Sequence, residues 1–578
     1  MAIRMELNPK PLPALKRHFG FVAATVTLAL FLLLFLSGTA YAATYTVNST
    51  ADAVPPVAGT LRWAIQRANT NPGLDSIEFN ISPADSGFNG QWWTINLSQN
   101  LLRISEDVII NGSTQTVHQG DTNPGQIGWS VTHPGFTVGT GPDGVPATGD
   151  EMPFPSFEKR EIEINASGYE AFVILRGVSN VTIEGVAVFN ARNGIRVGFG
   201  GTADGGKDNL IRGCIAGARA DGSYPGDASR INMFGVQVLR PNYAKVSGCY
   251  VSWCGRVGID GIVADGPTTM DVEYCECFEN GWATNEHDGI DINGINSSVR
   301  YCLSRNNTIN NPSNNSSGGG AGIEIGSTND TSLNGQNIVE ENTVFGNYHG
   351  IVARDGQCNN VIRNNLVFDN HGPGIIVSYE TMLAKGNTIS KNSIFDNAGL
   401  GIDLQYGGAN GEGVTWNNGG YNATYGNDEM DFPVITLAKI EGNTLHLEGY
   451  VGSAPGQFVF ASAMIEFFLA SFDGNANPNP GVSTDAYPYH GEGRTYLGSL
   501  VADANGKFNG DLVVSSTDLR PNDWITASAT DTQGNTSEFA ENTRVLQLLP
   551  VPVMTPVGLV TLLILLSVVL ARASVRRR

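Results

Sequence analysis

The chain is short of positive charge, of cysteine and of charged residues altogether. Of its 578 residues, 34 are Lys or Arg against 55 Asp or Glu, and the formal net charge is −21. A body this acidic repels polyanions, which excludes nucleic acid and anionic membrane surfaces as partners. The seven cysteines include no CxxC pair, which excludes a zinc cluster of the usual spacing. Charged residues make up only 15%, whereas 71 residues are Gly, and this balance favours turn-rich β structure over helical bundles.

What the chain does contain is a recurring phrase, Gly-Ile-x-Ile or a close variant. Its copies return every 23 to 41 residues, and a unit this small cannot bury its own apolar face. The repeat therefore predicts stacked coils. In each copy we expect the two aliphatic side chains to point inward and the residue between them to point outward to solvent. The eight copies begin at Gly194, Gly235, Gly258, Gly289, Gly322, Gly350, Gly374 and Gly401.

A second phrase precedes each Gly-Ile and ends, in most blocks, in Asn. Successive coils of a parallel β-helix lie about 4.8 Å apart, so equal slots become vertical neighbours. We expect the Asn side chains to form buried hydrogen-bonded ladders, and the cysteines that open the earlier blocks to be mostly free interior fillers. The first slot holds Cys214, Cys249, Cys275 and Cys302 in the earlier blocks, and the last slot holds Asn190, Cys254, Asn280, Asn307, Asn347, Asn370 and Asn397.

From Glu161 to Leu404 this pattern resembles the right-handed parallel β-helix of the pectin-lyase-like superfamily. The resemblance implies an all-β chain with a β-helix over residues 161–431. It does not imply an activity, because the same scaffold serves lyases, hydrolases, epimerases, adhesins and structural proteins.

Residues 43–160 are expected to form an N-terminal cap and the first coils. Residues 59–69 read as a short helix with one apolar face, and residues 75–79 as a strand. Together with residues 104–114 they resemble the N-terminal segment of CSLREA-type bacterial surface proteins, with Gly59 in place of the initial Cys. The helix would plug the open end of the stacked coils. The Gly- and Pro-rich stretch 120–152 is expected to be a long loop.

From residue 432 the character of the chain changes to short alternating strands separated by Gly, Asn and Pro turns. Strands are predicted at Leu445–Tyr450, Ile465–Leu469, Thr495–Val501, Phe508–Val514 and Trp524–Thr530. This spacing predicts a β-sandwich over residues 432–546. It resembles the sandwich that follows β-helices of the CSLREA type.

Both ends of the chain are expected to be targeting segments with terminal signal and transmembrane helices. Residues 1–42 look like a signal peptide, with a basic start, an apolar run and Ala40-Tyr41-Ala42 as a site for signal peptidase; an uncleaved anchor is the alternative. Residues 547–578 resemble an IPTL/PEP-CTERM sorting tail, which implies an exosortase-like sorting peptidase as partner. A permanent C-terminal anchor is the alternative. In each case the body lies outside the cytoplasmic membrane, in the bacterial cell envelope, at the surface or secreted.

The outward slot of the Gly-Ile phrase supplies the candidate site. Asp260, Asp291 and Glu324 occupy it in three successive coils and should stack on one face. With His287 and Asp288 they are the candidate catalytic residues, because paired carboxylates beside a His can act as acid and base. The same three stacked acids could instead bind calcium through their oxygens. A solvated acidic ladder without a ligand is the third interpretation.

Two short motifs resemble polygalacturonase-type hydrolases: His287 to Asp291, and Tyr348-His349-Gly350. The paired Asp-Asp and the Arg-Ile-Lys motifs of that family are absent. Whether the chain is an enzyme is thus left open, and we expect a binding protein instead. No cofactor is required, although calcium fits the acids.

Three functions follow as hypotheses. The first is an exported surface protein that binds extracellular polysaccharide or matrix. The second is a polysaccharide lyase or glycoside hydrolase acting on an acidic glycan. The third is a structural spacer without a ligand.

Overall fold

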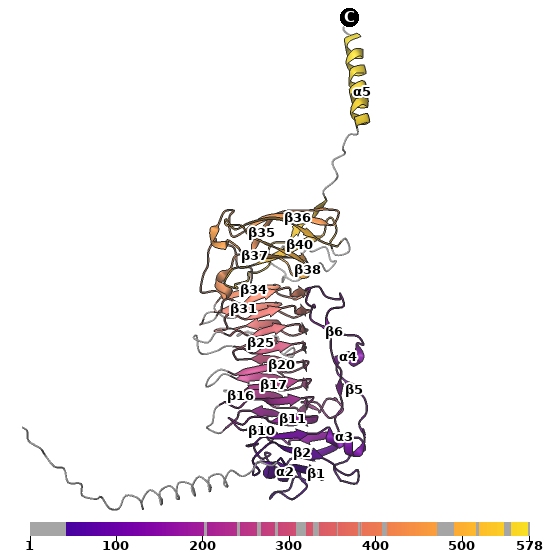
Figure 1. The fold of residues 1–578 in the computed structure, drawn as a ribbon, viewed down its shortest axis with the longest axis vertical. Helices are drawn as coiled ribbons and strands as arrows, with labels where there is room; N and C mark the ends of the chain where they lie inside the picture. The colour runs from indigo at the N-terminus through magenta and orange to yellow at the C-terminus, as the bar shows by residue number, and fades with distance from the viewer. Residues whose placement is uncertain are drawn as a thin grey trace, which may run out of the picture.

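Three long parallel sheets wind around a common interior in the computed structural model, and a β-sandwich follows them (Figure 1). This is the predicted right-handed β-helix with a sandwich behind it. The structure describes residues 42–200, 205–239, 243–262, 268–283, 287–307, 320–326, 335–354, 356–379, 382, 384–406, 413–470, 490–515, 519–547 and 556–575.

Each complete coil of the β-helix contributes one strand to each of three sheets, here named A, B and C, and the incomplete coils at the N-terminal end leave these with 11, 10 and 9 strands. Sheet A consists of β1 (Thr44–Val47), β2 (Asp75–Phe79), β4 (Val108–Asn111), β11 (Thr182–Glu184), β14 (Asn209–Arg212), β17 (Tyr243–Ser247), β20 (Thr269–Glu273), β23 (Ser298–Arg300), β26 (Ile338–Glu340), β29 (Val361–Arg363) and β32 (Thr388–Ser390). Sheet B consists of β3 (Trp93–Asn96), β9 (Ile162–Asn165), β12 (Val186–Phe189), β15 (Ile215–Ala216), β18 (Tyr250–Ser252), β21 (Glu276–Phe278), β24 (Leu303–Arg305), β27 (Thr343–Phe345), β30 (Leu366–Phe368) and β33 (Ser393–Phe395).

Sheet C is built from the Gly-Ile phrases. It consists of β10 (Phe172–Ile174), β13 (Ile195–Val197), β16 (Val236–Leu239), β19 (Ile259–Ile262), β22 (Ile290–Ile292), β25 (Ala321–Ile325), β28 (His349–Ala353), β31 (Ile375–Tyr379) and β34 (Ile402–Tyr406). The aliphatic side chains on either side of the outward slot, such as Ile290 and Ile292, are buried in one continuous core. The period-2 alternation of a strand thus turns the repeated phrase into an apolar inner wall.

The predicted Asn ladder runs through the turn that follows sheet B. From Asn280 through Asn307, Asn347 and Asn370 to Asn397, each side-chain Nδ2 donates to the Oδ1 of the next Asn at 2.8–3.2 Å. Two further columns show the same bonding, Asn342–Asn365–Asn392 and Asn337–Asn360–Asn387. Ladders of this kind satisfy polar groups that no water reaches.

Two other residues were predicted for the last slot, Cys254 and Asn190, and only the first of them lies in the Asn column. Cys254 stands in the Asn column as expected, since its N–H donates to Asn280 Oδ1 at 3.1 Å. Asn190 does not: it is half-buried, has a left-handed backbone (φ 50°) and donates to Asn165 Oδ1. All seven cysteines are free thiols, and the four first-slot cysteines are buried in the core.

A short helix closes the N-terminal end of the β-helix. Helix α2 (Leu61–Ala68) begins after Thr60, whose hydroxyl accepts a hydrogen bond from Trp63 N. Its buried face is the predicted one, Leu61, Ala64, Ile65 and Ala68, and these residues belong to the same core as the coil interior. The predicted strand at 75–79 is β2. The plug therefore shields apolar interior that would otherwise face water.

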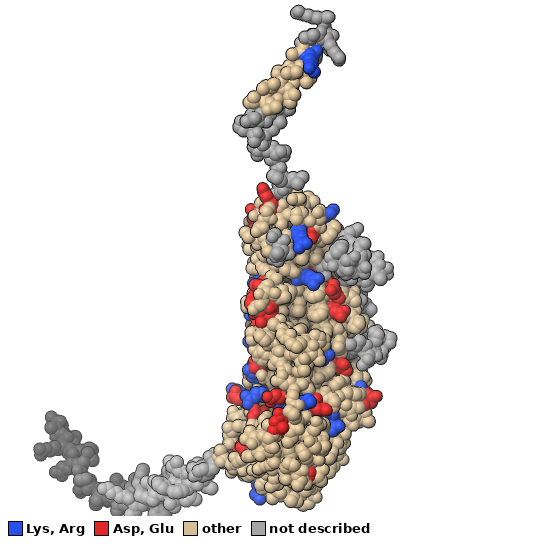
Figure 2. Space-filling model, turned by 90° about the vertical axis from the view of Figure 1, so that its right-hand side faces the viewer, with Lys and Arg blue, Asp and Glu red and all other residues tan. Residues whose placement is uncertain are grey.

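The stretch expected to be a long loop is an ordered strap along the outside of sheet B. It contains β5 (Gln126–Ile127), α4 (Trp129–Thr132), β6 (Thr137–Val138), β7 (Met152–Pro153) and β8 (Phe157–Glu158), and it follows helix α3 (Thr114–Gln119). In Figure 1 these elements run beside the stack on its right, and Figure 2 looks onto that side of the molecule. Apolar side chains of the strap, among them Phe154 and Phe157, pack on outward residues of sheet B such as Tyr250 and Phe278. The strap therefore buries a face that the repeat alone leaves exposed.

The sandwich consists of two four-stranded sheets. One contains β35 (Pro433–Glu441), β36 (Thr444–Val451), β39 (Lys507–Val513) and β42 (Leu546–Gln547); the other contains β37 (Met464–Ala470), β38 (Gly493–Val501), β40 (Trp524–Thr530) and β41 (Thr543–Arg544). All five predicted strands are present. The two inner faces share a separate apolar core.

The sandwich also caps the C-terminal edge of all three sheets of the β-helix. Side chains of the sandwich accept hydrogen bonds from backbone N–H groups of the last coil, which no further coil can satisfy. These bonds run from Ile389 to Thr536 Oγ1 (2.9 Å), from Asn397 to Glu492 Oε1 (3.2 Å) and from Leu404 to Glu538 Oε1 (3.1 Å).

Helix α5 spans Pro556–Val575, within the predicted tail. Of the helices in the described residues, none is both long and apolar enough to be a candidate for crossing a membrane. The predicted transmembrane tail is thus not confirmed. The predicted signal peptide lies almost wholly outside the described residues, so export and sorting stay predictions.

Candidate functional site

The outward slots of the Gly-Ile phrase form one column on sheet C. Strand register aligns Arg196, Gln237, Asp260, Asp291, Glu324, Val352, Ile376 and Asp403 as successive partners. The three acids predicted to stack are therefore vertical neighbours. Their stacking follows directly from the parallel pairing of equal positions in successive coils.

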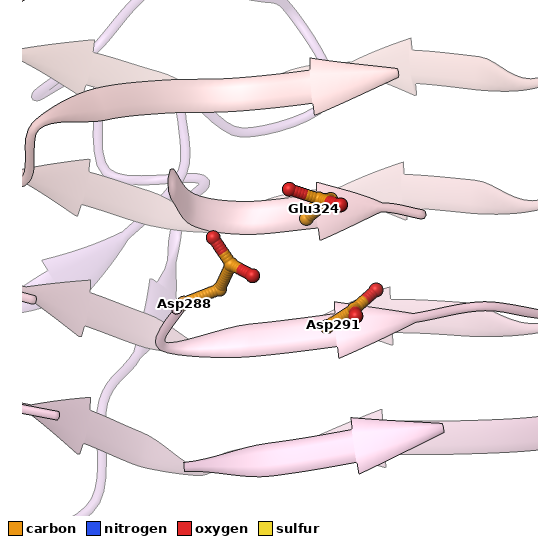
Figure 3. A group of neighbouring side chains, drawn as sticks. All are labelled: Asp288, Asp291 and Glu324. Carbon is orange, nitrogen blue, oxygen red and sulfur yellow. The ribbon is translucent and has the colours of Figure 1, made fainter. Parts of the chain in front are cut away.

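Three carboxylates converge in the middle of this column (Figure 3). Asp288 lies just before β22, Asp291 lies within β22, and Glu324 lies on the next strand, β25. One oxygen of each carboxylate lies within 4.8 Å of the others. The cluster therefore contains Asp288 and two of the three acids predicted to stack, Asp291 and Glu324. The third, Asp260, lies one coil earlier.

The column is buried, which differs from the expectation that it faces solvent. Asp260 is 2% exposed, and Asp291 and Glu324 are each 7% exposed. The backbone of Gly326 lies close to the slot: a Cβ there would lie 2.0 Å from Asn293 Oδ1 and 2.6 Å from Asp291 Oδ1, so a side chain at this position would have to displace those two groups. An outward direction from the coil is therefore not the same as contact with water.

Burial and mutual repulsion disfavour ionisation of these acids. Burial raises the pKa of Asp291 well above its usual range, and the nearby charges of Glu324, Asp260 and Asp288 raise it further. Burial likewise raises the pKa of Asp288, with Glu324 adding to the effect. A positive charge among these carboxylates would reverse the balance and favour their ionised forms.

The surrounding polar groups satisfy only part of the cluster. Arg354 Nε lies 2.8 Å from Glu324 Oε1, and Asn293 donates to Asp291 Oδ2. The backbone N–H of Ala321 donates to Asp288 Oδ1 at 2.7 Å. Asp291 Oδ1 is buried and has no hydrogen-bond partner within the described part of the chain. A buried carboxylate oxygen without a donor is the atom that a cation would bind.

Asp260 is held by a chain of hydrogen bonds that comes from the preceding coils. Arg196 Nε donates to Gln237 Oε1 at 2.8 Å, and Gln237 Nε2 donates to Asp260 Oδ2 at 2.7 Å. Burial raises the pKa of Asp260 to about 7, and the bond from Gln237 opposes that rise. Asp260 is therefore a titratable acid with a fixed orientation beside the cluster.

Neither of the two nearby histidines, His287 and His349, belongs to the three converging groups. His287 is half-buried and precedes Asp288 directly, but it is not one of the three groups that converge. His349, on β28, is 3% exposed, and burial lowers its pKa to about 3, so its ring is neutral. A neutral, buried imidazole contributes packing here and no counter-charge.

The cluster fits a hard divalent cation. Calcium takes six to eight oxygen ligands, and carboxylates from three residues in two coils supply the first of them. Backbone, water or a bound molecule would supply the others. The repeat in the sequence predicted Asp291 and Glu324 as possible calcium ligands. Asp288 was predicted only as a catalytic candidate, because it lies outside the repeated slot.

A comparison with known protein families supports the β-helix. Residues 171–358 match a family model described as a right handed beta helix region. Among solved structures, the chain is similar to the Dettilon tailspike protein gp208, at 12% identity over 86% of this chain and 91% of that chain with a TM-score of 0.30. It is also similar to the A-module of the mannuronan C-5 epimerase AlgE6 of Azotobacter vinelandii, at 12% identity over 64% and 82% with a TM-score of 0.27. These likenesses do not transfer an activity to this chain.

Proposed function

We propose that this chain is an exported envelope protein that binds an acidic extracellular polysaccharide through a divalent cation held by Asp288, Asp291 and Glu324. The observation that supports the proposal is the convergence of three buried carboxylates within 4.8 Å, one of them with an unpartnered oxygen. Without a cation, such an arrangement is stable only if protons neutralise it.

The charge of the chain favours a bridging cation over direct binding. A chain of net charge −21 repels a polyuronate, so carboxylates of the polymer need a positive group between them and the protein. Arg354 beside Glu324 and Arg196 at the start of the column add positive charge to the same face.

The first test measures the cation alone. For the full-length protein at pH 7.5, about 1 mM CaCl₂ is expected to raise the melting temperature by about 2–5 °C relative to EDTA, because a bound ion stabilises only the folded state. Asp291→Asn should abolish the shift. The matched control is Asp403→Asn, which changes a buried acid in the same slot outside the cluster and should keep the shift. Equal melting temperatures in calcium and EDTA would refute the cation site.

The second test adds the polymer. Retention of polygalacturonate by the full-length protein is expected in calcium, and it should disappear with EDTA or with Asp291→Asn. Retention that survives EDTA would show that the polymer binds without the cation, and absence of retention of any uronate polymer would remove the glycan from the proposal.

One observation favours catalysis as a second candidate function. Asp260, with a pKa near 7, stands next to carboxylates that a cation would keep ionised, which is the pairing that acid–base chemistry needs. Unsaturated products or new reducing ends from polygalacturonate, lost in Asp260→Asn, would establish this function. Binding without turnover would exclude it.

A further inference from the structure

An acid occupies an inward slot of β2, near the N-terminal end of the stack (Figure 1). Burial alternates along this strand, so Asp75 points to the same side as Ile77 and Phe79, which belong to the apolar core. Asp75 is 1% exposed. An ionised carboxylate in such a slot is costly unless a positive charge or several donors face it. A group that balances Asp75 therefore has to lie close to it.

The described residues supply donors for only one oxygen of this carboxylate. Oδ1 accepts from Asn71 Nδ2 at 2.7 Å and from the backbone N–H of Ala43 at 2.8 Å. Oδ2 is buried and has no hydrogen-bond partner in the described part of the chain. No ion pair between described residues includes Asp75. In the uncleaved chain a buried carboxylate is thus left without a counter-charge.

The nitrogen that contacts Asp75 belongs to the residue that follows the predicted signal peptidase site. Ala40-Tyr41-Ala42 places the cleaved bond between Ala42 and Ala43. Ala42 is exposed, whereas Ala43 is already fixed at the edge of sheet A, because its carbonyl accepts from Ser76 N at 2.8 Å. The new terminus would therefore form beside the carboxylate and needs no path into a closed site.

Hydrolysis of this bond changes the donor that faces Asp75. One water is consumed, a carboxylate remains on Ala42, and the nitrogen of Ala43 becomes an ammonium at neutral pH. An amide N–H is a single uncharged donor, whereas an ammonium has three donors and a full positive charge. Because this nitrogen lies 2.8 Å from Oδ1, the charge forms within ion-pair distance of the carboxylate. Shielding from water strengthens such a pair.

We infer that removal of residues 1–42 creates an ion pair between the new α-ammonium of Ala43 and the buried carboxylate of Asp75, and that this pair fastens β1 to sheet A. Among the described strands β1 is the outermost of that sheet and pairs with β2 alone. A short outermost strand opens easily unless it is held. The inference rests on the export part of the proposed function and not on the cation site, which lies beside sheet C.

The first measurement identifies the terminus. The full chain, expressed in an exporting bacterial host, is expected to yield a protein whose intact mass and N-terminal sequence begin at Ala43. A protein that retains residues 1–42, or that begins at another residue, overturns the inference.

The second measurement tests the ion pair by hydrogen exchange of β1. It compares the chain that begins at Ala43 with the same chain carrying one Gly before Ala43, both released from a cleavable fusion. The described apolar cores contain no residue before Val47, so both forms keep them. The added Gly moves the ammonium by about 3.8 Å and leaves the amide of Ala43 as donor. The amides of Thr44–Val47 are expected to exchange about tenfold faster in the Gly-extended form, because the buried charge loses its partner.

Asp75→Asn completes a double-mutant cycle. It should speed the exchange of β1 about tenfold in the form that begins at Ala43 and less than about twofold in the Gly-extended form. The control is Glu78→Gln, an acid on the outward side of β2, which should act equally in both forms.

Equal exchange rates in the two wild-type forms overturn the inference, and so do equal effects of Asp75→Asn in both. If Asp75→Asn fails to fold, the comparison of the two wild-type forms still decides. The calcium tests above report on other residues, so their failure would leave these outcomes unchanged.

Discussion

Asn347→Ala is expected to destabilise the protein by about 3–5 kcal/mol, because it breaks the Asn ladder at its centre. Asn347 is fully buried, and its Oδ1 accepts from both the backbone N–H and the side chain of Asn307. Its Nδ2 donates to Ser304 O and to Asn370 Oδ1. Alanine leaves these donors and acceptors buried without partners, and water has no route to replace the amide.

Denaturant unfolding followed by tryptophan fluorescence measures this loss. The control is Asn509→Ala, which removes an exposed Asn from the sandwich strand β39 and should change stability by less than about 0.5 kcal/mol. A loss below about 1 kcal/mol for Asn347→Ala would show that the ladder is a consequence of the stacking and contributes little to it.

Raising the pH from 6 to 9 is expected to destabilise the junction between the β-helix and the sandwich. Burial raises the pKa of Glu492 to about 8 and that of Glu538 to about 7, from an ordinary value of 4.5, while bonds from Asn397 and Leu404 partly oppose the rise. A carboxyl with a higher pKa in the folded state stabilises the fold fully below pH 4.5. That stabilisation is lost as the pH rises through the folded pKa.

For Glu492 alone the loss between pH 6 and 9 is about 2–3 kcal/mol. Glu492→Gln keeps an acceptor for Asn397 and cannot ionise, so the pH dependence of its unfolding free energy should be smaller by that amount. Glu448→Gln, an exposed acid on β36, serves as the control and should follow the wild type. If Glu492→Gln and the wild type lose stability equally, Glu492 is not protonated in the fold.

The sequence alone was enough to predict the stacking. Side chains of a strand alternate between its two faces, so the repeated phrase determines which residues face inward. The register from Asp260 through Asp291 to Glu324 could therefore be predicted from the sequence. The Asn ladder followed from the same argument, and so did the sandwich strands, whose alternation is plain between their turns. These features depend on residues close in sequence or equal in register.

What packs outside the coils could not be predicted in this way. The repeat does not reveal that Gly326 lies close to Asp291, nor that Asp288, outside the repeated slot, turns toward Glu324. The strap was expected to be a loop because Gly and Pro dominate it, and its partners lie up to about 250 residues away.

The strap has a consequence for how the molecule responds to force. Thr140 N donates to Asn364 O and Lys391 Nζ to Pro142 O, so a segment that begins beside the first coils is fastened to the last ones. A simple array of repeats peels from an end, one unit after another. In this protein a force on either terminus acts on distant coils at the same time, so the coils should unfold cooperatively and not one after another. The same tether raises contact order, so folding should be slow.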